Sequence, residues 1–127
     1  MKTILVDAYQ TFVLPETGIF TELHELLETY PNRKMIVTNA NDEQMVTFGL
    51  VNMPYEMFTM KHEPDKDNPI FFKTLLENYN LKVEDVIYFE HSPEAVKSAE
   101  SLGIKAYFYD AGKKDLVALK NFLDTNC

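Results

Sequence analysis

Short apolar segments alternate along the chain with longer segments in which apolar residues recur every three or four positions. The short segments predict buried strands, and the longer periodic segments predict amphipathic helices. A regular alternation of the two is typical of a parallel α/β domain. The pattern predicts five strands, over residues 3–6, 34–37, 57–60, 86–89 and 104–109.

Residues that favour helix ends mark the boundaries of five predicted helices. Asn41 and Asn68 are expected N-caps, Pro69 and Pro93 suit the first turn of a helix, and Gly103 suits a helix end. With right-handed crossovers, these elements form an open, doubly wound (Rossmann-like), five-stranded parallel sheet with helices on both faces. The predicted helices cover residues 19–30, 42–50, 69–79, 93–102 and 116–123.

Length and composition limit the classes of protein that this sequence can encode. The 127 residues are typical of one domain, so we expect residues 1–127 to form a single domain. Twenty acidic residues against twelve basic ones give a charge of −8, which argues against a nucleic-acid or membrane-binding surface. The N-terminal apolar segment is too short for a signal peptide, and the one cysteine, Cys127, excludes an internal disulfide. These features predict a cytoplasmic protein.

Polar residues that follow the predicted strands are the candidates for a functional site. In a doubly wound sheet, ligands bind beside the carboxyl ends of the strands. Strands end at the surface, so a single polar residue after a strand is often only solvated. Several such residues that lie together are needed to indicate a functional site. The candidates are Asp7, Thr38, Asn39, Thr59, Met60, Glu90, His91, Ser92 and Asp110.

Four segments, in order, resemble the motifs of the haloacid dehalogenase-like (HAD) superfamily. Residues 7–11 (Asp-Ala-Tyr-Gln-Thr) resemble the first motif, Asp-x-Asp-Gly-Thr after an apolar strand. Residues 35–39 are similar to the second motif, and residues 66–72 to the segment with the third-motif lysine. Residues 86–92 fall where the family has a strand followed by Gly-Asp-Ser. The order and spacing imply a HAD-like core.

The resemblance implies a hydrolase of the phosphatase type in which Asp7 is the nucleophile. Thr38 and Lys66 would then hold and neutralise the substrate anion, and Tyr9 stands at the position of the family's general acid and base. Attack of a carboxylate on phosphorus forms an aspartyl-phosphate, and the transferred group needs preplaced donors for its negative charge. The implied partner is a phosphorylated substrate, including a macromolecular one. Further substrate-binding residues are expected at Thr11, Asn39 and Ser92.

The sequence departs from the family pattern at three places. Tyr9 replaces the second aspartate of the first motif, and a tyrosine is a poor base at neutral pH. Gln10 replaces the glycine of a tight turn. Glu90 and His91 replace the Gly-Asp of the fourth motif, whose aspartate helps to hold Mg²⁺, and imidazole is a poor ligand for this cation. A Mg²⁺ site on Asp7 and Glu90 is therefore expected to be weak or absent.

Two functions remain open at this point. The first is a capless hydrolase, since the segments between the motifs are too short for a cap domain. The second is a catalytically inactive HAD-like protein that serves as a binding or scaffold module. Dehalogenation, suggested by Asp-Ala-Tyr-x-Thr, is disfavoured because it relies on a large cap that excludes water. A two-component receiver domain is rejected because the third predicted strand ends at Thr59 and Met60 rather than at an aspartate.

The histidines and the aromatic clusters are not expected to form a further site. His24, His62 and His91 lack the spacing of metal ligands, and His24 is expected on an exposed helix face. Residues 71–72 and 107–109 are aromatic, but no basic stripe flanks them, so they are predicted to belong to the core.

Overall fold

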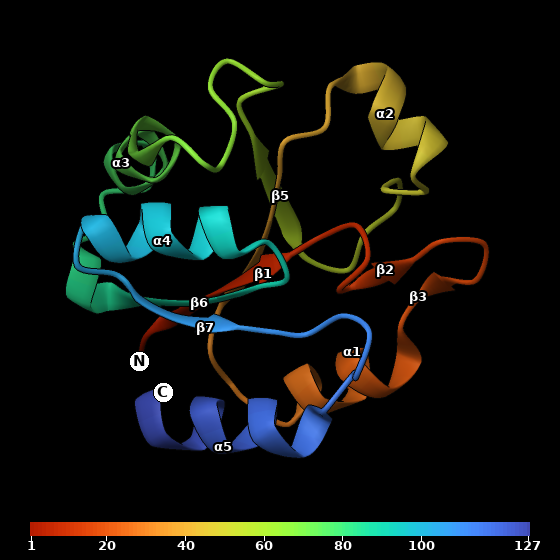
Figure 1. The fold of residues 1–127 in the computed structure, drawn as a ribbon. Helices are drawn as coiled ribbons and strands as arrows, with labels where there is room; N and C mark the ends of the chain where they lie inside the picture. The colour runs from red at the N-terminus through yellow and green to blue at the C-terminus, as the bar shows by residue number, and fades with distance from the viewer.

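A five-stranded parallel sheet forms the centre of the computed structural model, which describes residues 1–127 (Figure 1). The strand order is β5-β4-β1-β6-β7. Because β1 pairs with both β4 and β6, it occupies the middle of the sheet. The strands are β1 (Thr3–Asp7), β4 (Lys34–Thr38), β5 (Glu56–Thr59), β6 (Val86–Glu90) and β7 (Lys105–Phe108).

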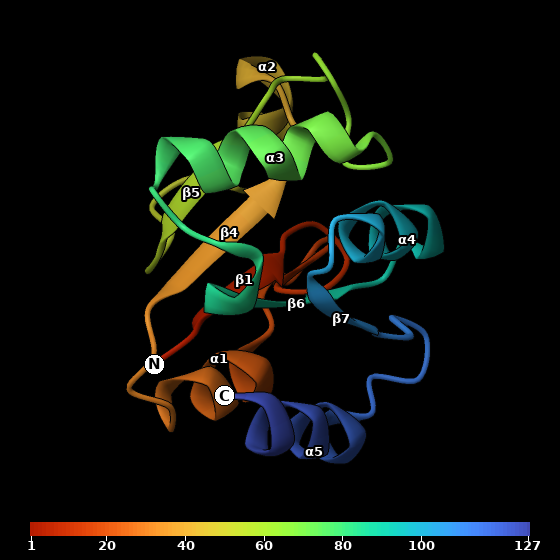
Figure 2. The same ribbon diagram turned by 90° about the vertical axis from the view of Figure 1, so that its left-hand side faces the viewer.

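Helices cover both faces of this sheet (Figures 1 and 2). α1 (Thr21–Glu28) and α5 (Leu116–Asn126) lie on one face, and α3 (Pro69–Asn78) and α4 (Pro93–Ser101) lie on the other. The short helix α2 (Asp42–Thr47) lies beyond the carboxyl end of β4 (Figure 2). This arrangement confirms the predicted doubly wound α/β architecture.

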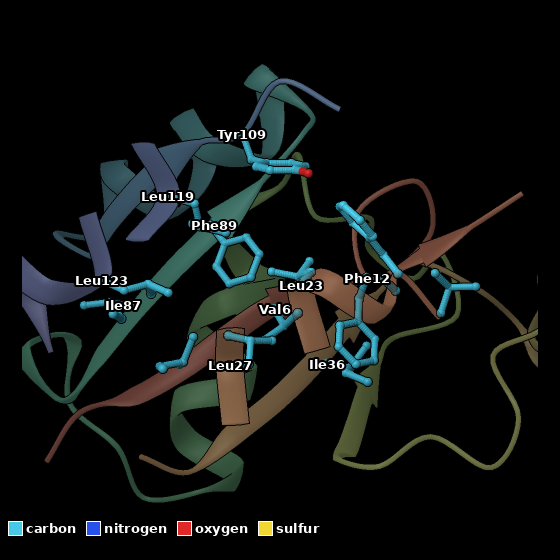
Figure 3. Packing of buried hydrophobic residues seen from close by; sticks show 14 of the residues in the cluster. Val6, Phe12, Leu23, Leu27, Ile36, Ile87, Phe89, Tyr109, Leu119 and Leu123 are labelled. Atoms are coloured by element: carbon cyan, nitrogen blue, oxygen red, sulfur yellow. The ribbon is translucent and has the colours of Figure 1, made fainter. Parts of the chain in front are cut away.

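The sheet separates two hydrophobic cores. Successive strand residues point to opposite faces, so Ile4 and Val6 of β1 face α1 and α5, whereas Leu5 faces α3 and α4. Burial on both faces explains why the strands are continuously apolar rather than alternating. Figure 3 shows the first core, in which α1 and α5 pack on the sheet through Leu23, Leu27, Leu119 and Leu123.

The segment between β1 and α1 differs from the sequence prediction. Residues of β2 (Val13–Leu14) and β3 (Gly18–Ile19) form an antiparallel hairpin that extends beyond the carboxyl end of β1 (Figure 1). The predicted helix consequently begins at Thr21 rather than at residue 19. Each strand has two residues, which is too few for an alternating pattern to appear in the sequence.

The connections at the carboxyl edge of the sheet are short. β1 and β4 are joined by the hairpin and α1, and β4 and β5 are joined by α2 and its flanking loops. Neither connection contains a cap domain, which agrees with the predicted HAD-like core without a cap. None of the helices combines the length and apolarity needed to cross a membrane.

Candidate active site

Asp7 ends β1 at the middle of the sheet's carboxyl edge, and its side chain is almost completely buried. Lys66 Nζ donates a hydrogen bond to its Oδ1 over 2.8 Å, and Thr11 Oγ1 donates to its Oδ2 over 2.7 Å. The backbone N–H of His91 donates to Oδ2 over 3.2 Å, and the imidazole Nδ1 of His91 contacts the same oxygen. Burial disfavours an unpaired carboxylate, so these partners hold Asp7 in its charged form and in one orientation.

Lys66 connects two buried acidic side chains that come from neighbouring strands. Its Nζ lies 2.8 Å from Asp7 Oδ1 and 2.6 Å from Glu90 Oε1. The backbone N–H of Lys66 donates to Asn39 Oδ1 over 2.7 Å, which ties the loop before α3 to the end of β4. Since Lys66 and Asp7 are 59 positions apart in the chain, only the tertiary fold brings them together.

Glu90 is the last residue of β6 and is fully buried. The hydroxyl of Tyr88 donates to its Oε1, and the backbone N–H of Ser92 donates to its Oε2 over 3.0 Å. Tyr88 and Glu90 are two positions apart on one strand and therefore share a face of the sheet. Burial and the neighbouring acidic groups raise the pKa of Tyr88 well above its ordinary value, so its hydroxyl remains a donor.

Opposite charges set the protonation states of this cluster. Burial alone would raise the pKa of Asp7, but the charge of Lys66 and the hydrogen bond from His91 hold it well below the usual range. Burial would lower the pKa of Lys66, but the charges of Asp7 and Glu90 raise it above its usual value. Hydrogen bonds to Asp7 and Glu90 raise the pKa of His91 to about 10. At neutral pH, Asp7 is therefore ionised beside two cationic side chains.

An open pocket of about 240 Å³ contains this cluster. The rings of Tyr9 and Phe48 line the pocket and stack with their centroids 4.2 Å apart and an interplanar angle of 16°. The predicted residues Asp7, Tyr9, Thr38, Asn39, Lys66, Glu90 and Ser92 all line the pocket, together with His91.

Three of the predicted residues also have structural contacts of their own. Thr11 is completely buried, is not part of the pocket lining and contacts Asp7, so its hydroxyl orients the carboxylate. Thr38 Oγ1 accepts a hydrogen bond from the backbone of Ala40 over 3.2 Å. Ser92 is the N-cap of α4 and lines the pocket.

Sequence reasoning missed several side chains of the site. Gln44, Phe48 and His62 line the pocket from α2, from the residue that follows α2 and from the loop after β5. No sequence signal indicated them, because α2 buries no residue and its position depends on the path between β4 and β5. The expectation for His24 was wrong, since it is half-buried and packs edge-on against the rings of Phe12 and Tyr55.

Gln10 adopts a left-handed backbone conformation, with φ of 73°, at the position where the motif that residues 7–11 resemble has glycine. A residue with a side chain pays about 1 kcal/mol or more for this conformation. We expect Gln10→Gly to stabilise the protein by up to about 1 kcal/mol, since the relieved strain exceeds the entropy that glycine adds to the unfolded chain. Urea unfolding measures the change. Gln10→Ala is the matched control and should leave stability unchanged, and a loss of stability in Gln10→Gly would contradict this reasoning.

The acidic and imidazole groups of the site also form a candidate cation site. Potential ligand atoms of Asp7, Glu90 and His91 lie within 4.8 Å of one another. Such a cluster could hold a divalent cation, and its donor set mixes oxygen with nitrogen.

Comparison with known proteins adds evidence for the fold. No protein-family model and no curated protein sequence matches this chain. Solved structures do match. A HAD family enzyme from Bacteroides thetaiotaomicron, in a magnesium complex, superposes with a TM-score of 0.68 at 16% identity, over 94% of this chain and 98% of that one.

Two further structures agree with this likeness. The same Bacteroides enzyme in complex with magnesium and inorganic phosphate has a TM-score of 0.66 at 15% identity, over 88% of this chain and 96% of that one. A HAD-superfamily hydrolase from Geobacter sulfurreducens has a TM-score of 0.65 at 12% identity, over 94% of this chain and 99% of that one. The protein therefore has a HAD-like fold, as the sequence motifs implied.

Proposed function

We propose that the protein is a phosphomonoester hydrolase in which Asp7 is the nucleophile. The observation that carries this proposal is an ionised, oriented carboxylate at the centre of the sheet's carboxyl edge, in a pocket and beside two cationic side chains. The Bacteroides enzyme with a similar fold binds magnesium and inorganic phosphate, which supports a phosphorylated substrate for this site. The open, uncapped pocket suits a substrate large enough to cover it, including a macromolecule.

Two steps account for the proposed reaction. An oxygen of Asp7 attacks phosphorus, the bond from phosphorus to the substrate oxygen breaks, and that oxygen leaves with the electron pair and takes up a proton. Water then attacks the aspartyl-phosphate, which releases inorganic phosphate and restores Asp7. In this proposal Lys66, which lines the pocket beside Asp7, would neutralise charge on the phosphoryl oxygens, and Thr38, Asn39 and Ser92 would supply polar groups to them from the pocket lining.

The residues present fit Mg²⁺ poorly. Mg²⁺ favours near-ideal octahedral coordination by oxygen, whereas one candidate ligand atom here is the imidazole nitrogen of His91. That nitrogen contacts Asp7 Oδ2 and lies 3.2 Å from Glu90 Oε2, so protonated His91 already bridges the two acidic groups. A cation at this place would have to displace a proton from a group whose pKa is about 10. We infer that His91 supplies the positive charge and that hydrolysis proceeds without Mg²⁺ or depends on it weakly.

We expect His91→Asp to make the protein respond to Mg²⁺. The substitution replaces the bridging cation with a third acidic side chain beside Asp7 and Glu90, which creates an all-oxygen set and repulsion that a divalent cation relieves. The melting temperature of the variant should be lower than that of the wild type in EDTA and should rise as Mg²⁺ is added.

His91→Asn is the matched control for this experiment. It removes the same positive charge without adding a negative one, so it should be destabilised and should gain much less from Mg²⁺. If Mg²⁺ raised the melting temperature of the wild type as much as that of His91→Asp, this result would show that His91 does not replace the metal.

The proposed function is tested with an activated aryl phosphomonoester and with orthovanadate, which mimics the transferred phosphoryl group. Turnover of p-nitrophenyl phosphate should occur in EDTA, and added Mg²⁺ should change it little. Orthovanadate should inhibit turnover and raise the melting temperature. A wild-type protein that shows neither turnover nor a thermal shift with orthovanadate, in EDTA and in Mg²⁺, would contradict the proposal and favour the non-catalytic binding module.

A further inference from the structure

The geometry points to His62, oriented by Asp65, as the proton donor to the leaving oxygen of an alkyl phosphomonoester. This inference rests on the proposed function and names the substrate class that the site can serve. An alcohol leaves as a strongly basic alkoxide unless an acid protonates it, so hydrolysis of such esters needs a positioned proton donor. Tyr9, the residue at the family's acid position, has its ring stacked on Phe48.

His62 lies in the loop after β5 and lines the same pocket as Asp7. Its side chain is 41% exposed, so solvent reaches the ring. His62 and Asp7 thus share one pocket, so a phosphomonoester bound at Asp7 lies in the cavity that the His62 ring lines.

Both nitrogens of the His62 ring lie within hydrogen-bond distance of oxygen atoms. Nδ1 lies 2.7 Å from Asp65 Oδ1, and Nε2 lies 2.5 Å from Gln44 Oε1. The Gln44 atom is a carbonyl oxygen, because it also accepts a hydrogen bond from the backbone N–H of Asn41 over 3.1 Å in the capping box of α2. Both ring nitrogens therefore face hydrogen-bond acceptors, which fix the orientation of the ring.

The loop that carries His62 is held in a strained conformation. Lys61 and His62 both adopt positive φ values, of 53° and 69°. Consecutive left-handed residues that are not glycine are costly and persist where the surroundings determine them, often at functional sites. Here the backbone N–H of Lys61 donates to Thr59 Oγ1 over 3.0 Å, and Lys61 Nζ pairs with Asp42 Oδ1 at 3.0 Å. These contacts hold the loop that follows β5, and the His62 ring in this loop lines the pocket.

The arrangement supports a balanced pair of proton transfers. As the bond from phosphorus to the leaving oxygen breaks, His62 Nε2 gives its proton to that oxygen, which takes the place of Gln44 as hydrogen-bond acceptor. The neutral ring then accepts a proton from the water that attacks the aspartyl-phosphate, and the imidazolium is restored. Asp65 holds Nδ1 throughout and acts as a positioning residue.

Substrates with graded leaving groups test this role. The wild type and His62→Gln are compared on 2,4-dinitrophenyl phosphate, whose leaving group needs no proton, and on an alkyl phosphate, whose leaving group does. We expect His62→Gln to lower kcat on the alkyl phosphate by about 10²- to 10⁴-fold and to change kcat on the dinitrophenyl ester only several-fold. Asp65→Asn should show the same selectivity with a smaller loss.

Glu63→Gln is the matched control, since it replaces an exposed acidic residue of the same loop and should leave both rates unchanged. Unfolding in urea checks that each variant is folded under assay conditions, and His62→Asn is a second variant in case His62→Gln is not. An equal loss on both substrates would overturn the assignment of His62 as proton donor. Absence of wild-type turnover on every ester would instead contradict the proposed function itself, so the two failures are distinguishable.

Discussion

Replacing Asp7 with asparagine is expected to reduce phosphomonoester turnover by at least about 10³-fold, as the loss of a nucleophile does in other enzymes that form covalent intermediates. Asparagine is nearly isosteric but does not form the aspartyl-phosphate. It also removes the negative charge that Lys66 and His91 face in the cluster. The measurement is steady-state turnover of an aryl phosphomonoester, combined with mass spectrometry of the denatured protein to detect a phosphoryl adduct that hydroxylamine removes.

Asp110→Asn is the matched control for this substitution. Asp110 lies just beyond β7, is exposed, and accepts hydrogen bonds from the backbone of Gly112 and Lys113, a role that asparagine can also fill. Asp110→Asn should show the same turnover as the wild type and should form the same phosphoryl adduct. Equal turnover in the wild type and in Asp7→Asn would exclude Asp7 as the nucleophile.

Replacing Lys66 with methionine is expected to destabilise the protein by about 3–5 kcal/mol. Lys66 is buried and is the shared partner of Asp7 and Glu90, so its removal leaves two buried acidic side chains facing each other with only His91 for compensation. Methionine has a similar volume, so the loss reports the broken ion network rather than a cavity. Chemical denaturation at neutral pH measures the free energy of unfolding.

Lys61→Met is the matched control, because Lys61 lies in the same loop but pairs with Asp42 at the surface, with 55% of its side chain exposed. Its loss should cost less than about 1 kcal/mol. Adding Asp7→Asn and Glu90→Gln to Lys66→Met should recover part of the lost stability, because the uncompensated charges are then removed. A Lys66→Met protein as stable as the Lys61→Met protein would show that the buried network contributes little to folding.

The charge of the site differs from the charge of the whole chain. The chain carries −8, yet Lys66 and His91 offset Asp7 and Glu90 within the pocket. The proposed phosphorylated substrate would therefore meet a local environment that is less negative than the composition suggests. The site keeps its charged groups and its pocket, and no observation favours the non-catalytic alternative.

The sequence by itself determined the five strands of the central sheet, the five helices and the chain positions that converge at the edge of the sheet, but not the β2–β3 hairpin. Strands buried on both faces are continuously apolar, and Asn41, Asn68 and Ser92 cap the helices that follow them. Because parallel strands end at the same edge, Asp7 and Thr38 were expected to lie together, and they line one pocket. Their catalytic roles remain predictions that the experiments above test.

Only the tertiary structure decided which way the remaining side chains point. Glu90 turns inward to Lys66, His91 bridges Asp7 and Glu90, and His62 reaches the pocket from a strained loop. Local patterns report burial and capping, which depend on neighbours within a few positions. The direction of a side chain after a strand depends instead on partners far away in the sequence, as the 59 positions between Asp7 and Lys66 illustrate. The sequence showed a histidine at position 91, but only the fold showed that its imidazole contacts both Asp7 and Glu90.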